Sequence, residues 1–229
     1  MFYYMYFGYG LVILAFLITL VADIYLRTRY KKYKKVKVKS GMTGAEVARE
    51  ILKDNGLEDI YVVETRGYLT DHYDPRAKVV RLSTDIYNGN SIASVSVAAH
   101  ECGHAVQDKE GYFFLRFRSF LVPIVNFSSK FGYLAVLIGL IFGSMDLAWV
   151  GIFLLVAILL FQLITLPVEF NASKRGKMFL SKLKVVETSE KSMASSMLMA
   201  AAMTYVASLI STLLELLRLV LIVMGNDRD

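Results

Sequence analysis

Residues 100–104 read His-Glu-Cys-Gly-His, which is the HExxH pattern. Positions i and i+4 of a helix lie on the same face, so the imidazoles of His100 and His104 can bind one metal ion. The carboxylate of Glu101 then lies beside the remaining coordination position, where it can take a proton from a water activated by the metal. These residue types at this spacing are typical of zinc hydrolases of the metallopeptidase type, with Glu101 as the general base.

A catalytic zinc site usually has three protein ligands and a water, so the two histidines need a partner. No histidine follows His104, and the third ligand is therefore expected to be a carboxylate or to come from upstream. The downstream carboxylates considered are Asp108, Glu110, Glu169, Glu187, Glu190 and Glu215. Asp108 has a short reach, because it lies one turn beyond His104. Glu169 is favoured, because a pair of membrane spans before it would return the chain to the same face. The alternative is an interfacial charge that ends a span.

The one cysteine and the remaining histidine have less specific interpretations. Cys102 excludes an internal disulfide framework, and inside the motif it is interpreted as a small packed residue rather than a nucleophile or ligand. His72 lies in the polar stretch 71–75, which the following proline predicts to be a loop. His72 is a candidate to donate a hydrogen bond to the reaction oxyanion, as are Tyr73 and Arg175. A role in fixing the loop is the alternative for His72.

The composition argues against an ordinary soluble domain. Of the 229 residues 55% are hydrophobic, and they occur in blocks. The first block, 1–26, is long enough for a transmembrane helix. A basic juxtamembrane segment, 27–39, follows it and predicts a cytoplasmic location for this end, with the N-terminus outside. A retained anchor is favoured over a signal peptide, because no positive segment precedes the block and no small-residue cleavage pattern ends it. The basic segment suits anionic lipid rather than nucleic acid.

Two further apolar regions predict three more spans. Residues 119–168 are expected to form a transmembrane hairpin, with helices over 124–143 and 147–168 and a tight turn at 143–146. Residues 193–224 are expected to form a fourth transmembrane or membrane-associated helix. Glu215 and Arg218 lie deep in this block, so a break or an amphipathic interfacial segment is the alternative there. About four transmembrane helices are predicted in all.

Residues 40–118 read as a small α+β domain. Thr43 and Glu46 form a capping-box pattern before a helix over 45–55, which Gly56 ends. Strands are predicted over 60–65 and 78–83. A helix over 91–108 carries the HExxH motif, which is the context that the motif requires. The fold class is therefore an α-helical membrane protein with a small zincin-like metalloprotease domain, and residues 169–192 are expected to carry the third ligand.

A strand just before the motif helix can align a substrate, because an extended peptide can pair with an exposed strand edge. The candidate residues are Val79, Val80, Arg81 and Leu82. An ordinary interior strand is an equally reasonable interpretation.

Several stretches extend the motif into a wider pattern: residues 67–75, 81–83, 98–107, 166–175 and 201–206. In these stretches the chain resembles the YugP-type membrane zinc metallopeptidases. It is similar, more distantly, to the HtpX and CAAX-prenyl-protease gluzincins, which also place membrane helices between HExxH and a Glu-x-x-x-Asp pattern. The resemblance implies that His100, His104 and Glu169 bind Zn²⁺ and that Glu101 is the general base. Ser173 stands where the distant group has aspartate, so the carboxylate that orients a histidine is missing or comes from elsewhere.

The function expected from the sequence is zinc-dependent hydrolysis of peptide bonds at the cytoplasmic membrane face. The expected partners are protein or peptide substrates, membrane proteins among them, and the lipid bilayer. A zinc-binding membrane scaffold that does not cleave is the alternative, although such a site has no need of Glu101. A transporter would predict more polar residues in the spans. The natural substrate and the oligomeric state stay open.

Overall fold

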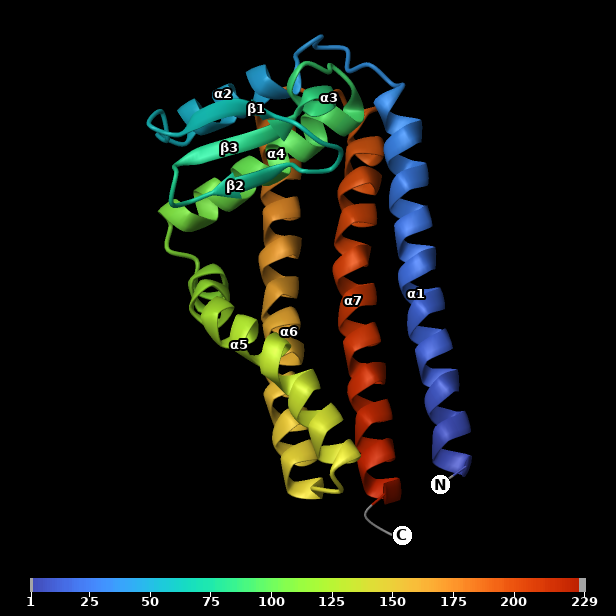
Figure 1. Cartoon of the computed structure of the whole chain (residues 1–229). Coiled ribbons are helices and arrows are strands. Elements are labelled where there is room, and N and C mark those ends of the chain that lie inside the picture. The colour runs from blue at the N-terminus through green and yellow to red at the C-terminus, as the bar shows by residue number, and fades with distance from the viewer. Residues whose placement is uncertain (1, 227–229) are drawn as a thin grey trace. The chain divides into compact units, whose positions relative to one another are not determined.

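The computed structural model describes residues 2–226, with side chains for 8–226. In chain order the elements are α1 (Phe2–Lys34), α2 (Gly44–Asp54), β1 (Tyr61–Thr65), β2 (His72–Asp74), β3 (Val79–Ser83), α3 (Thr84–Tyr87), α4 (Ile92–Lys109), α5 (Phe113–Ile141), α6 (Met145–Lys182) and α7 (Lys191–Asn226) (Figure 1). They form two compact units. The helical unit comprises Met1–Asp23, Phe117–Leu166 and Thr204–Asp229. The mixed unit comprises Ile24–Arg116 and Pro167–Met203.

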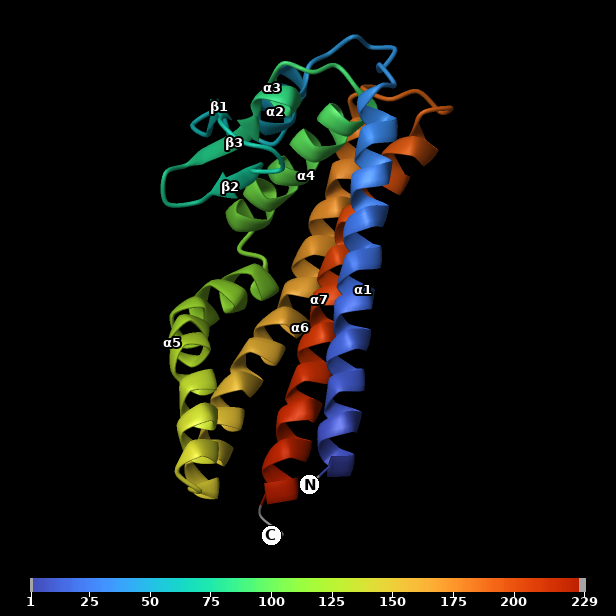
Figure 2. The ribbon, with the colours of Figure 1, turned by 45° about the vertical axis from the view of Figure 1, so that its right-hand side comes forward.

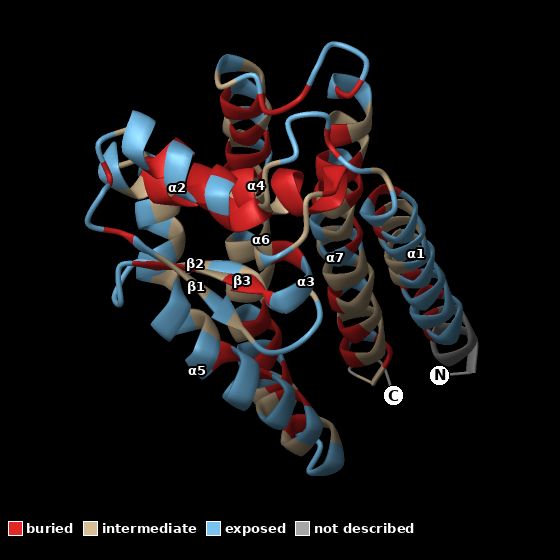
Figure 3. Ribbon diagram, turned by 90° about the horizontal axis from the view of Figure 1, so that it is seen from above, coloured by how far each residue is buried: buried red, intermediate tan, exposed pale blue. Residues whose placement is uncertain are grey.

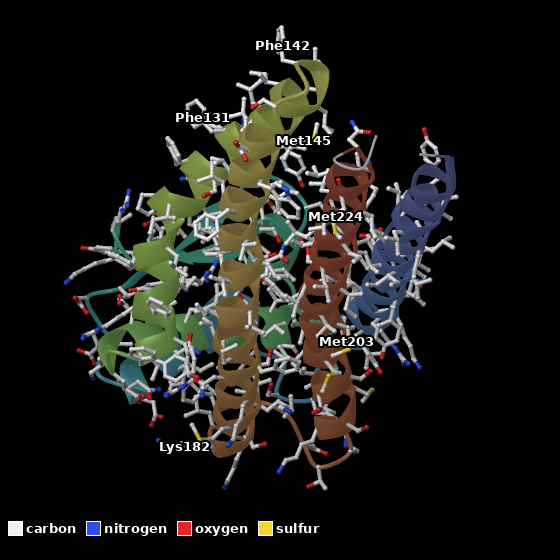
Figure 4. All side chains as sticks on the ribbon, turned by 90° about the horizontal axis from the view of Figure 1, so that it is seen from below. Phe131, Phe142, Met145, Lys182, Met203 and Met224 are labelled. Atoms are coloured by element: carbon white, nitrogen blue, oxygen red, sulfur yellow. The ribbon has the colours of Figure 1, made fainter. Side chains whose placement is uncertain are left out.

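Within the described residues, four helices are long and apolar enough to cross a membrane: Gly8–Lys34, Phe113–Ile141, Met145–Lys182 and Lys191–Asn226. This confirms the expected number of candidate spans. Large apolar side chains of the helical unit point outward, among them Phe131 and Phe142, which are labelled in Figure 4. Such a surface is stable in lipid and unfavourable in water. Phe142 and Met145 mark the tight turn between α5 and α6 in the same view.

Within the helical unit, α5, α6 and α7 share an apolar core that includes Val136, Leu155 and Leu219. Glycines allow α5 and α6 to pack closely, as small residues do in membranes. A Cβ at Gly151 would lie 2.6 Å from the carbonyl oxygen of Gly132. The interface between these two helices therefore depends on the absence of side chains at both positions.

Two predicted boundaries and one predicted alternative differ from the structure. Helix α5 begins at Phe113 and continues through Pro123, rather than beginning at residue 124. Helix α6 continues through Pro167 to Lys182, where the sequence predicted a span ending at 168 and a separate helix. A proline removes one N–H donor from a helix, but a long helix with packed flanks tolerates this loss. Helix α7 is continuous from Lys191 to Asn226, which excludes the predicted alternative of a break near Glu215.

The mixed unit contains a three-stranded sheet in the order β1-β3-β2 (Figure 2). Strand β3 pairs in parallel with β1, and β2 pairs antiparallel with β3. Of the two interpretations given for residues 79–82, the interior strand is therefore correct and the exposed edge is not: Val79, Val80 and Arg81 have paired neighbours on both sides, and Leu82 pairs with β1. The physical reason is the apolar character of both faces, since Val79, Val80 and Leu82 are all buried. The loop predicted at 71–75 contains the short edge strand β2.

Helix α4 passes through the core of the mixed unit. Ser91 is its N-cap, and its side chain accepts a hydrogen bond from the N–H of Ser94. Figure 3 shows α4 almost entirely buried, with α2 packed against it. The predicted capping box of α2 is present: the Thr43 side chain accepts a hydrogen bond from the Glu46 N–H, and the Glu46 carboxylate accepts one from the Thr43 N–H. Helix α4 is thus capped at its N-terminus and packed against α2 and the sheet, which keeps its side chains in defined positions.

Candidate metal centre

Three side chains converge where α4 approaches α6. The Nε2 atoms of His100 and His104 lie 3.2 Å apart, and the Glu169 Oε2 lies 3.2 Å from the first and 3.6 Å from the second. All three can offer one ligand atom to the same point, within 4.8 Å of one another. A tetrahedral Zn²⁺ with bonds of ~2.0–2.1 Å requires ligand atoms ~3.3–3.4 Å apart. The observed separations match this requirement.

The close approach of the two helices follows from small residues on their facing sides. A Cβ at Gly103 would lie 2.7 Å from the carbonyl oxygen of Ala172, and a Cβ at Gly176 would lie 3.2 Å from the amide nitrogen of His100. On α6 the positions 169, 172, 173 and 176 share one face, because they are three or four residues apart. The backbones therefore pack against each other at a distance that brings Glu169 to the histidines.

Neighbouring side chains determine which histidine nitrogen faces the site. The Nδ1 of His100 lies 3.1 Å from the Ser173 hydroxyl, and the Nδ1 of His104 lies 3.0 Å from the Gln107 Oε1. When each Nδ1 carries a proton and donates it to that oxygen, each Nε2 keeps a lone pair for a metal. The group that contacts the Nδ1 of His100 is thus the neutral hydroxyl of Ser173 and not a carboxylate.

Glu101 is buried but does not share the ligand position of the two histidines. It is 8% exposed and is not among the three converging groups. Burial raises the pKa of its carboxyl, while the neighbouring His100 and His104 act to lower it. A desolvated carboxylate is a stronger base than an exposed one, which suits the removal of a proton from a water.

The competing carboxylates have other partners. Asp108 accepts a hydrogen bond from the Tyr73 hydroxyl, and Glu110 pairs with Arg175. Glu190 accepts hydrogen bonds from the backbone N–H groups of Lys39 and Glu187. Glu187 pairs with Lys39, and Glu215 pairs with Arg218. The structure therefore brings Glu169, and none of the other five, to the two histidines.

The three candidates for stabilising an oxyanion have other partners in this structure. His72 is exposed, and its Nδ1 lies 2.8 Å from the carbonyl oxygen of Thr70. It alternates along β2 with Tyr73, whose hydroxyl reaches Asp108 on α4, so His72 points to the opposite face of the sheet. Burial and this hydrogen bond raise the pKa of Tyr73, which keeps it a donor. Arg175 is bonded to Asn171 and Glu110.

Cys102 is buried, as expected for a packed residue, and its thiol lies 3.6 Å from the carbonyl oxygen of Ala48 on α2. Sequence reasoning missed Gln107 and Asn171 as parts of the site. Gln107 lies three residues after His104, so helical spacing places it on the ligand face of α4. That spacing was the signal that could have identified it.

The fold and the site together define a class: a membrane protein with several candidate spans and a preorganised His-His-Glu centre. A comparison with protein families agrees with this class. Residues 8–224 match the family described as "Putative neutral zinc metallopeptidase", and the chain belongs to this family. It is 48% identical over 208 residues to the "Putative membrane protease YugP" of Bacillus subtilis (strain 168), which covers 91% of this chain and 92% of that relative. No solved structure matches the chain.

Proposed function

We propose that this chain is a membrane-embedded, zinc-dependent endopeptidase that hydrolyses peptide bonds at the cytoplasmic face. The observation that carries the proposal is the convergence of His100, His104 and Glu169, with buried Glu101 next to His100 in the chain. The donor set fits Zn²⁺, because two imidazoles and one carboxylate at tetrahedral spacing are typical of catalytic zinc sites. The family description and the named relative support the same activity.

When bound, zinc supplies a Lewis acid that polarises the substrate carbonyl and lowers the pKa of a water to about 7. Glu101 accepts the proton of the attacking water and later delivers it to the leaving amine. His100 and His104 stay neutral as ligands, so Glu169 contributes the only negative charge of the three. Ser173 and Gln107 keep the two imidazoles oriented.

A substrate peptide in this proposal pairs with β2 rather than with β3. Strand β2 is an edge of the sheet and packs against α4, the motif helix (Figures 1 and 2). An extended segment added to this edge would run alongside the motif helix. The side chains of β3 contribute to the core beneath.

The orientation in the membrane rests on charge. The basic segment 27–39 overlaps the C-terminal end of the first candidate span. His104 precedes the second candidate span, and Glu169 lies toward the C-terminal end of the third, on the far side of the α5–α6 hairpin. A cytoplasmic site predicts that a cysteine replacing Ser144 reacts with a membrane-impermeant maleimide in intact cells, whereas one replacing Ser189 reacts after the cells are opened. Cys102 gives little background, because it is buried. The opposite labelling pattern refutes this orientation.

The catalytic proposal is tested with the purified full-length chain in detergent. Peptide hydrolysis should be lost with a chelator and restored by Zn²⁺. Glu101→Gln should abolish hydrolysis while the bound zinc is retained, and Glu169→Gln should lower the zinc content. Asp108→Asn is the matched control and should leave the zinc content unchanged. Zinc binding without any peptide turnover in the wild type would favour the non-cleaving scaffold, and full activity in Glu101→Gln would exclude the proposed base.

A further inference from the structure

A chain of polar side chains leads from the surface of the mixed unit to one proposed metal ligand. Arg175 pairs with Glu110 at 2.5 Å and donates from Nε to the Asn171 Oδ1 at 2.8 Å. The Gln107 Nε2 donates to the same Asn171 oxygen and to the carbonyl oxygen of Val168, both at 2.9 Å. The Gln107 Oε1 lies 3.0 Å from the Nδ1 of His104. The chain thus joins α4 to the segment of α6 that carries Glu169.

In each hydrogen bond of this series, only one of the two groups can be the donor. Arginine is a donor only, so Asn171 must present its oxygen to Arg175. A backbone carbonyl is an acceptor only, so Gln107 must present its NH₂ group to Val168 and Asn171. The Gln107 oxygen then faces His104, and the Nδ1 of His104 must carry the proton. The remaining nitrogen, Nε2, is the one that points at His100 and Glu169.

The environment makes this arrangement costly to change. Gln107 is fully buried, yet its oxygen and its nitrogen are both hydrogen-bonded. Turning its amide over would place oxygen against oxygen at Val168 and leave buried groups without partners. Gln162, the other glutamine of the chain, differs from it, because its Oε1 is buried and without a hydrogen-bond partner.

We infer that Gln107 is a positioning residue, which holds His104 in the tautomer that binds the metal through Nε2 and locks the Glu169 segment against the motif helix. The inference rests on the proposed metal site and adds to it a residue without a ligand role of its own. Asn171 and Arg175 act through Gln107, because they determine the orientation of its amide.

The test measures zinc affinity by competition with a chromogenic chelator, using the full-length chain in detergent. Gln107→Met keeps the length of the side chain but removes the acceptor for His104 and the donors to α6. Its zinc affinity should fall by ~10- to 100-fold, the usual effect of removing a partner of a metal-bound histidine. Gln162→Met is the matched control and should bind zinc as the wild type does. The absorption of bound Co²⁺ should change in Gln107→Met alone.

A conservative variant separates positioning from packing. Gln107→Glu keeps an oxygen for His104 and removes the NH₂ group that bonds to α6, so its zinc affinity should exceed that of Gln107→Met by at least about tenfold. The unfolding temperature of the metal-free proteins reports the packing effect by itself. Equal zinc affinities in Gln107→Met and Gln107→Glu would assign Gln107 a structural role and overturn the inference, as would wild-type affinity in Gln107→Met.

If Gln107→Met does not fold, Asn171→Ala replaces it, since that variant removes one of the two bonds that orient the amide. A fall in its zinc affinity of several-fold supports the inference, and wild-type affinity overturns it. A different result would refute the proposed function. A wild type that binds zinc but cleaves no peptide leaves the affinity comparison intact, whereas Gln107→Met with normal affinity and normal cleavage refutes the inference alone.

Discussion

Replacing Gly103 with alanine tests whether the backbone contact between α4 and α6 sets the geometry of the metal site. The added Cβ would lie 2.7 Å from the carbonyl oxygen of Ala172, whereas ordinary contacts begin at 3.4 Å. The helices must therefore separate locally by about 0.7 Å. Metal sites tolerate deviations of only about 0.2 Å in ligand distances. Because Glu169 lies on the same face of α6 as Ala172, it should move away from His100 and His104.

The expected result for Gly103→Ala is a fall in zinc affinity of at least about tenfold, together with a loss of stability of ~1–3 kcal/mol from overpacking. The intrinsic helix preference acts in the opposite direction, since alanine favours a helix by ~1 kcal/mol over glycine. If Gly103→Ala acted only within α4, it would therefore leave the stability of the protein unchanged or raise it. Gly10→Ala in α1 is the matched control, because nothing lies within 4 Å of the added methyl group.

The assay is chelator competition for zinc, with thermal unfolding of the metal-free protein as the second measurement. A Gly103→Ala variant that binds zinc with wild-type affinity would show that the close contact does not determine the position of Glu169. A fall of the same size in Gly10→Ala would show that the effect is not specific to the site.

Three further predictions follow from single contacts. Ser173→Ala removes the oxygen that faces the Nδ1 of His100, so zinc affinity should fall by ~10-fold in chelator competition; an unchanged affinity would contradict the orienting role. Thr43→Ala removes the capping box of α2 and should lower stability by ~1 kcal/mol in thermal or denaturant unfolding, with zinc affinity unchanged. The hydrogen bond and charge of Arg175 lower the pKa of Glu110. The Arg175–Glu110 pair therefore stabilises the folded state at pH values above the unfolded-state pKa of ~4.3. This stabilisation is lost as the pH falls through the folded-state pKa of Glu110. The difference in unfolding temperature between the wild type and Glu110→Gln should be small, because Glu110 is largely exposed, and should vanish toward about pH 3. A difference that grows as the pH falls would contradict the predicted pH dependence.

Local patterns in the sequence predicted the elements well. The capping box at Thr43, the helix that carries the HExxH motif and the apolar blocks depend on patterns within one segment, so their formation does not depend on the rest of the fold. The spacing of His100 and His104 is local in the same sense, since one turn of helix places both imidazoles on one face. These features were predicted and are present.

Interactions between distant segments could not be predicted in the same way. The order of strands in a sheet depends on which strands pair, and local sequence patterns do not show this pairing. For this reason the sequence left β3 equally open to an edge or an interior position. The structure makes β3 the central strand, with β1 paired along one edge and β2 along the other, and the side chains on both of its faces are mostly buried. His72 is a second case: its residue type suggested chemistry, but the alternation along β2 directs it away from Tyr73 and α4.

The sequence by itself determined half of the candidate site: two histidines and a glutamate on one turn of a helix, in a chain with enough apolar length for several spans. The sequence favoured Glu169 among six carboxylates, and only the tertiary structure shows it beside the histidines, because that position depends on the backbone contact of Gly103 with Ala172, which joins helices far apart in the chain. The same contact brings in Ser173, and Gln107 bonds across it. Helical periodicity specifies which residues share a face, whereas packing specifies which faces meet.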